Sequence, residues 1–151
     1  MKNKKINKRI WVVCIVVLLV FACIYAIIGN PIVAINNSKL EQSFTAITAE
    51  TVAFNEIVPF DWDMVYTFEP YTSKAEIEAM IGFKSNAIQE SISEGMVQLL
   101  FVKNNKVVAG ICTYASNLGY SVNFADKILY SDNAVFRVQK EAGIVQLSHI
   151  K

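Results

Sequence analysis

Hydrophobic residues form one uninterrupted run near the N-terminus. The stretch from Ile10 to Ile28 contains no charged side chain. A helix of this length is about 28 Å long at about 1.5 Å per residue, which is close to the roughly 30 Å hydrocarbon core of a bilayer. A buried core helix would be shorter and would show a polar face. The pattern therefore predicts a transmembrane helix over residues 10–28.

The basic residues around this run predict its orientation. The tail 1–9 contains four lysines and one arginine and no acid, and the next basic residue is Lys39. Because basic flanks stay cytoplasmic, we expect a signal anchor, a single-pass topology in the cell membrane and an extracytoplasmic C-terminal domain. The bilayer is then one partner of the protein, through residues 10–28. The segment Leu19–Cys23 is also similar to a loose lipobox, so lipidation of Cys23 is an alternative form of anchoring.

The next periodic segment predicts a helix. Residues 29–37 contain glycine and proline and are expected to form a linker that ends the first helix. Ser38 and Glu41 then have the spacing of a capping box. Apolar residues recur at helical spacing over 38–54, which predicts an amphipathic helix of about four turns. These residues are Leu40, Phe44, Ile47 and Phe54.

The segment FDWDMVYTFEPYTS, residues 60–73, has a different period. Alternate positions are apolar, which predicts a half-buried strand that the proline of the segment ends. The apolar face consists of Trp62, Met64, Tyr66 and Phe68. Ser73 and Glu76 then form a second capping-box pattern. A short helix is expected over 74–81, closed by Gly82.

The C-terminal half follows a β pattern. Residues 83–95 are expected to form a helical turn or two and then a loop. Two apolar strands flank Asn104-Asn105, a pair that predicts a tight hairpin because asparagine tolerates positive φ. The expected strands cover 96–102, 106–114, 120–124, 128–130, 134–138 and 144–150. Residues 38–151 therefore predict one α+β domain in which helices pack on one face of an antiparallel β-meander.

The segment around Trp62 carries a resemblance to known proteins. The order W-D-x-V-Y-x-F-x-P-Y-T, followed by an E-I-E helix that ends in I-G, resembles a group of small, uncharacterised bacterial envelope proteins with a lipoprotein signal or one N-terminal span. The resemblance implies membrane tethering and a similar fold, and it implies no activity. The matching residues are Trp62, Asp63, Val65, Tyr66, Phe68, Pro70, Tyr71, Thr72, Glu76, Ile77, Glu78, Ile81 and Gly82.

Charge and cysteine content narrow the classes of function. The chain after residue 30 contains thirteen acidic and nine basic residues, a net charge of −4. An acidic domain lacks the basic stripe that nucleic acid requires, so no nucleic-acid partner is expected. Cys112 is the one cysteine outside the apolar run, which leaves no internal disulfide in the domain. With His149 as the single histidine, a zinc site or another cofactor site is not expected either.

Three acids form one candidate site. Asp61, Asp63 and Glu69 lie close together in the sequence, and paired carboxylates can perform general acid–base catalysis. Two acids that flank Trp62 on a strand point the same way, about 7 Å apart. The alternative is that both simply lie on the solvent face opposite Trp62. We favour this alternative and assign no catalytic residue.

Aromatic residues near predicted turns form a second candidate site, because exposed tyrosine is common at interfaces. Phe60 and Tyr71 are the foremost of these. Others are Tyr114, Tyr120 and Tyr130. We therefore expect a non-covalent binding domain whose partner is a protein or an envelope component, with Phe60, Asp61, Asp63 and Tyr71 as the candidate binding residues.

Two more specific functions remain open. An immunity protein that neutralises a toxin at the cell envelope would suit a small acidic domain, since complementary charge favours association with a basic toxin. An envelope enzyme that uses Asp61, Asp63 and Glu69 is the other alternative.

Overall fold

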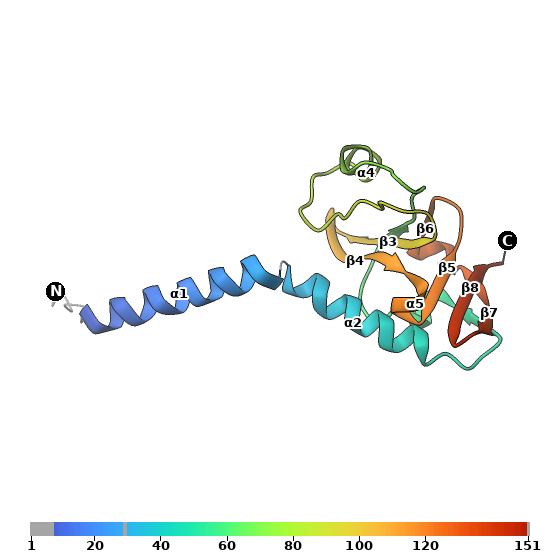
Figure 1. Cartoon of the computed structure of the whole chain (residues 1–151), viewed down its shortest axis with the longest axis horizontal. Coiled ribbons are helices and arrows are strands. Elements are labelled where there is room, and N and C mark those ends of the chain that lie inside the picture. The colour runs from blue at the N-terminus through green and yellow to red at the C-terminus, as the bar shows by residue number, and fades with distance from the viewer. Residues whose placement is uncertain (1–7, 29, 151) are drawn as a thin grey trace. The chain divides into compact units, whose positions relative to one another are not determined.

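The computed structural model describes residues 8–28 and 30–150, and within the first helix it describes side chains over 10–22. The chain divides into two compact units, Met1–Pro31 and Ile32–Lys151. Figure 1 follows the elements along the chain. The helices are α1 (Lys8–Ile28), α2 (Pro31–Thr45), α3 (Phe54–Ile57), α4 (Lys74–Ile81), α5 (Ala115–Leu118) and the 3-10 helix η1 (Tyr130–Asp132). The strands are β1 (Thr51–Ala53), β2 (Met64–Tyr66), β3 (Met96–Lys103), β4 (Lys106–Tyr114), β5 (Tyr120–Asn123), β6 (Lys127–Leu129), β7 (Val135–Glu141) and β8 (Ile144–His149).

The helix α1 corrects the predicted membrane topology. In the described part of the chain, no helix combines the length and the apolar character needed to cross a bilayer. The predicted transmembrane helix over 10–28 is therefore wrong. The signal anchor, the single-pass cell-membrane topology and the extracytoplasmic placement depended on it and are wrong as well. The expected contact of residues 10–28 with a bilayer stays a prediction.

The second unit contains two four-stranded sheets. Sheet A has the strand order β1-β7-β8-β5 and sheet B the order β4-β3-β2-β6. From β4 to β7 successive strands alternate between the two sheets, β7 and β8 then form an antiparallel pair in sheet A, and β5 pairs with β8 in parallel. The domain is α+β, but the predicted antiparallel meander is wrong. A parallel pair requires a crossover rather than a hairpin, and here the chain between β5 and β8 visits both sheets.

Sheet B is buried on both faces. Successive side chains of β3 point alternately into two different hydrophobic cores. We call the one between the two sheets the inter-sheet core and the one beneath α4 the α4 core. The inter-sheet core includes Leu99 and Phe101 of β3 with Leu40 and Phe44 of α2, and the α4 core includes Leu100 and Val102 of β3 with Ile77 and Ile81 of α4. Figure 1 shows α4 and α2 on opposite sides of sheet B. The expectation of helices on one face is therefore wrong. A strand whose side chains are apolar on both faces must be covered on both faces.

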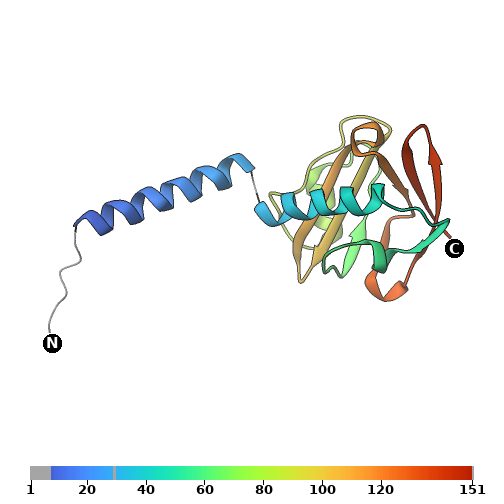
Figure 2. The same cartoon turned by 90° about the horizontal axis from the view of Figure 1, so that it is seen from below.

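The predicted linker 29–37 is wrong over most of its length, since α2 begins at Pro31. Proline is favourable at the first position of a helix, where its missing N–H would have had no partner in the helix. Figure 2 shows α2 lying across the strands of the domain. The Asn36 Nδ2 donates to the Val108 carbonyl at 2.9 Å, and Asn37 both donates to the Gly110 carbonyl at 2.8 Å and accepts from the Gly110 N–H at 2.9 Å. These amides bond to the open edge of β4. The segment predicted as a linker therefore packs on sheet B and bonds to its edge strand.

Two predicted helical segments also differ from the structure. The helix expected over 38–54 ends at Thr45 and is followed by β1. Several β-branched residues follow Thr45 in this stretch, and such residues have low helix propensity. Residues 83–95 form turns instead of a helical turn or two. There the Ala87 N–H donates to the Ser85 Oγ at 3.2 Å, a local bond that competes with helix formation.

The local signals at α4 and at the β3–β4 hairpin are confirmed. Ser73 and Glu76 form the predicted capping box, and Gly82 ends α4 with a left-handed φ of 84°. Asn104 and Asn105 adopt φ values of 49° and 55° in the two-residue turn between β3 and β4. These motifs are decided by residues close in sequence. The capping box predicted at Ser38 and Glu41 is wrong, because both residues lie inside α2 and not at its start.

Candidate functional site

One open pocket brings together three of the predicted binding residues. Phe60, Asp61 and Asp63 line it, and its volume is about 490 Å³. We call it the Trp62 pocket, after the buried indole at its wall. The full lining consists of Asn55, Val58, Pro59, Phe60, Asp61, Trp62, Asp63, Lys103 and Tyr130. The pocket is thus built by the α3 region, the segment before β2, the end of β3 and η1.

Trp62 belongs to the inter-sheet core and not to the face predicted for it. Met64, Tyr66 and Phe68 pack against the α4 core, whereas Trp62 is 2% exposed in the other core. The regular strand β2 begins only at Met64, so the alternation does not extend back to Trp62. The indole has edge contacts with Phe54, Phe101 and Tyr130, at ring-centroid distances of 5.7, 5.9 and 5.3 Å.

The indole N–H of Trp62 has no hydrogen-bond partner among the described residues. A buried N–H without a partner costs about 1–3 kcal/mol relative to a paired one. Most buried donors are therefore paired in native structures, and an exception calls for an explanation. In this case the donor belongs to a residue that lines an open pocket.

Asn55 provides a second unpaired polar atom at the same pocket. Its Nδ2 donates to the Tyr130 carbonyl at 2.7 Å and to the Asn133 Oδ1 at 3.0 Å. These bonds fix the side-chain amide, and the Asn55 Oδ1 is buried without a donor among the described residues. Trp62 and Asn55, two residues that line the pocket, therefore carry one buried donor and one buried acceptor without a partner among the described residues.

Asp63 is tied into the fold. Its Oδ2 accepts from the Asn104 N–H at 2.7 Å, and its Oδ1 pairs with the Lys103 Nζ at 3.0 Å. The hydrogen bond from Asn104, followed by the one from Lys103, lowers the pKa of Asp63. The hydrogen bond with Asp63 is likewise the main cause that raises the pKa of Lys103. Asp63 thus joins the segment before β2 to the β3–β4 hairpin.

Asp61 differs from Asp63 in having no ion pair among the described residues. It is exposed and lies near enough to Lys103 to raise the pKa of that lysine slightly. The expectation that both acids lie on the solvent face therefore agrees with the exposed Asp61, whereas Asp63 is also tied to the β3–β4 hairpin. Asp63 has a structural role, and Asp61 is the carboxylate that remains available at the Trp62 pocket.

Glu69 and Tyr71 lie outside the Trp62 pocket. Glu69 lines a different pocket, near Thr72 and Asp126, so the three predicted acids do not form one cluster. Tyr71 is 63% exposed, and its backbone has an unusual left-handed φ of 67°. A bulky residue with this φ is a genuine outlier. Its N–H donates to the Ser91 carbonyl at 3.1 Å, which holds the loop in this conformation.

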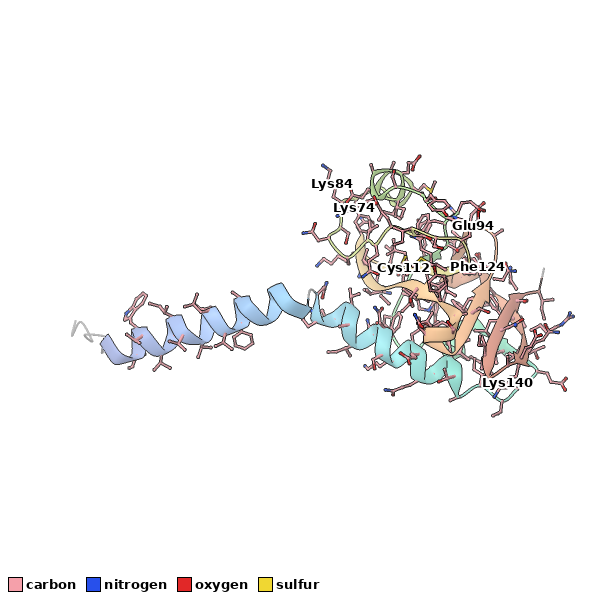
Figure 3. All side chains as sticks on the ribbon, viewed as in Figure 1. Lys74, Lys84, Glu94, Cys112, Phe124 and Lys140 are labelled. Carbon is pink, nitrogen blue, oxygen red and sulfur yellow. The ribbon has the colours of Figure 1, made fainter. Side chains whose placement is uncertain are left out.

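The remaining candidates are dispersed. Cys112 lines a small cavity of about 10 Å³ next to Gln98, and burial raises its pKa. Figure 3 shows Cys112 within the domain. His149 instead packs against Phe136, at a ring distance of 5.3 Å. The side chain of Cys23 lies outside the described residues, so its lipidation stays a prediction. In the described part of the chain, no three His, Cys, Asp or Glu side chains are grouped to hold a metal ion.

Sequence reasoning missed two functional residues of the Trp62 pocket. The sequence pattern assigned no role to Asn55 or to Lys103. Both reach the pocket through long-range contacts, since Asn55 bonds to Tyr130 and Lys103 to Asp63. Tyr130 was noted as an aromatic residue near a turn, but nothing in the sequence linked it to Trp62.

Comparisons with known proteins add no family to this picture, because no family model, curated protein or solved structure matches the chain. The resemblance seen around Trp62 stays a prediction.

Proposed function

We propose that the domain formed by residues 32–151 is a non-covalent binding module that recognises a protein partner at the Trp62 pocket. One observation carries the proposal. The Trp62 Nε1 and the Asn55 Oδ1 are both buried without partners, and both residues line the same open pocket. A ligand that supplied one acceptor and one donor would remove two desolvation penalties of about 1–3 kcal/mol each.

Other unpaired polar atoms in the domain lack this relation to an open pocket. Gln98 Oε1 lines the small cavity of about 10 Å³, and Tyr120 Oη lies in the inter-sheet core. A cavity of that size holds about one water molecule and no ligand. The Trp62 pocket is therefore the better place for recognition.

The arrangement of acids favours binding over acid–base catalysis. Catalysis by paired carboxylates needs two acids that face one reacting group. Asp63 is engaged with Lys103 and Asn104, and Glu69 lines a separate pocket. Asp61 is left without a second available carboxylate among the pocket residues. An immunity protein that blocks a basic toxin surface would be one instance of such a module, in keeping with the net charge of −4 after residue 30.

The experiment is an affinity capture with the full chain, using lysate and secreted material of the producing cells. Wild type is compared with Tyr130→Ala, which removes a rim side chain that is 50% exposed and contacts Trp62. The matched control is Tyr114→Ala, a tyrosine of β4 that is 43% exposed and does not line the pocket. Circular dichroism verifies that each variant is folded.

We expect a stoichiometric protein that wild type and Tyr114→Ala retain and Tyr130→Ala loses. Interface aromatic residues that act as anchors cost about 2 kcal/mol or more when truncated, which is roughly a 30-fold loss of affinity. A partner that Tyr130→Ala retains as well as wild type does would show that recognition lies elsewhere. The same conclusion would follow if the folded chain captured no protein.

A further inference from the structure

The hydrogen-bonding groups of the Trp62 pocket specify the chemistry of its ligand, and this inference rests on the proposed function. An indole N–H can only donate, and an amide oxygen can only accept. A ligand that bonded to both buried atoms would offer an acceptor to Trp62 and a donor to Asn55. A peptide segment carries both kinds of group along its main chain and side chains.

The charges at the pocket favour a cation. Its lining includes two carboxylates and one ammonium group. Asp63 and Lys103 neutralise each other through their 3.0 Å ion pair, whereas Asp61 is exposed and unpaired among the described residues. The net charge of the lining is thus negative, and it comes from Asp61. An anionic ligand would meet a lysine that is already occupied.

The rim of the pocket supplies aromatic surface. Phe60 is half-buried, with its ring edge-on to Phe101 at 5.3 Å, and Tyr130 is 50% exposed. Planar guanidinium groups stack on aromatic faces and donate several hydrogen bonds in a fixed geometry. A lysine ammonium is a more strongly hydrated point charge and makes less use of such a surface.

We propose that the Trp62 pocket binds an arginine side chain presented by a protein segment. Its guanidinium donates to the Asp61 carboxylate and to the Asn55 Oδ1 and lies against the ring of Tyr130. A main-chain carbonyl of the same segment accepts from the Trp62 Nε1. The pocket volume of about 490 Å³ is within the usual range for ligand sites, and it accommodates one such side chain with the adjoining peptide.

The test uses the indole N–H as its own reporter. The chain has two tryptophans, so the full chain with Trp11→Phe gives a single indole cross-peak in a ¹H–¹⁵N spectrum. This protein is titrated with the capped tripeptide acetyl-Gly-Arg-Gly-amide and with its lysine and citrulline counterparts. Citrulline keeps the shape and most N–H donors of arginine but lacks the charge.

We expect the arginine peptide to shift the Trp62 indole cross-peak with a Kd on the order of 1 mM, since a small ligand makes few contacts. The lysine and citrulline peptides should bind several-fold more weakly. Asp61→Asn should weaken the arginine peptide about two- to fivefold, the size typical of an exposed ion pair. The charge-matched control is Asp126→Asn at a different pocket, which should bind like Trp11→Phe alone.

Two outcomes would overturn the arginine assignment. One is equal binding of the arginine and citrulline peptides, or no effect of Asp61→Asn. The other is an indole cross-peak that no peptide moves, which would mean that water alone satisfies the Trp62 N–H. Neither outcome decides the proposed function, because the capture experiment with Tyr130→Ala and Tyr114→Ala tests the pocket with the natural partner.

Discussion

Two groups of polar side chains in this domain have opposite hydrogen-bond states. Asn36 and Asn37 of α2 bond to the backbone of β4, through three bonds of 2.8–2.9 Å. At the Trp62 pocket, the indole N–H and the Asn55 Oδ1 have no partner among the described residues. Both groups lie at the margin of the same sheet B, and both contain asparagine.

We infer from this difference that the α2 amides stabilise the fold, whereas the polar groups at the Trp62 pocket serve recognition of a partner. The edge of β4 would expose backbone groups, and the α2 amides satisfy those of Val108 and Gly110. At the Trp62 pocket the fold holds two polar atoms in place without satisfying them. Unpaired polar atoms are costly in a closed core, and beside an open pocket the same cost favours a partner that can bond to them.

The largest expected effect on stability comes from removing the hydrogen bonds between α2 and β4. Asn37→Ala removes two hydrogen bonds and leaves the Gly110 N–H and carbonyl unpaired at the edge of β4. We expect a loss of about 2–4 kcal/mol in the free energy of unfolding, measured by urea denaturation. The control is Ser38→Ala on an exposed neighbouring position, which should stay within about 0.5 kcal/mol of wild type. Equal stability of the two variants would contradict a structural role for Asn37.

An intermediate effect is expected at Trp62. Trp62→Phe keeps an aromatic ring in the inter-sheet core and removes an N–H that bonds to nothing in the described fold. The variant should lose only about 1–2 kcal/mol in urea denaturation, for the reduced volume, yet it should lose its partner in the capture experiment. A loss of stability above about 3 kcal/mol with capture unchanged would show that the indole N–H supports the fold instead.

The smallest effect concerns Asp63 at low pH. Its folded-state pKa lies below the ordinary value, so its contribution to stability is present above the unfolded pKa of about 4 and is lost as pH falls through the folded value. Wild type should therefore lose stability below about pH 4 more steeply than Asp63→Asn does, in denaturation series at successive pH values. Lys103→Gln should keep most of the steepness, because the Asn104 N–H is the main cause of the shift. The interpretation is wrong if Lys103→Gln and Asp63→Asn give the same profile.

The sequence by itself determined the features that depend on neighbouring residues. The Ser73–Glu76 capping box, the Gly82 end of α4 and the Asn104-Asn105 turn were all predicted correctly, because each is stabilised by contacts within a few residues. It also placed Phe60, Asp61 and Asp63 together as candidates for binding, and the structure brings these three into one pocket.

Only the tertiary structure decided the features that depend on distant partners. The division into two sheets, the parallel pairing of β5 with β8 and the role of Asn37 at Gly110 each join segments far apart in the chain. The Trp62 pocket has the same origin, since Asn55 and Tyr130 meet across the fold. Periodicity shows that a side chain is buried but not what lies opposite it. The unpaired atoms of Trp62 and Asn55 could therefore be recognised only after the fold had placed every possible partner.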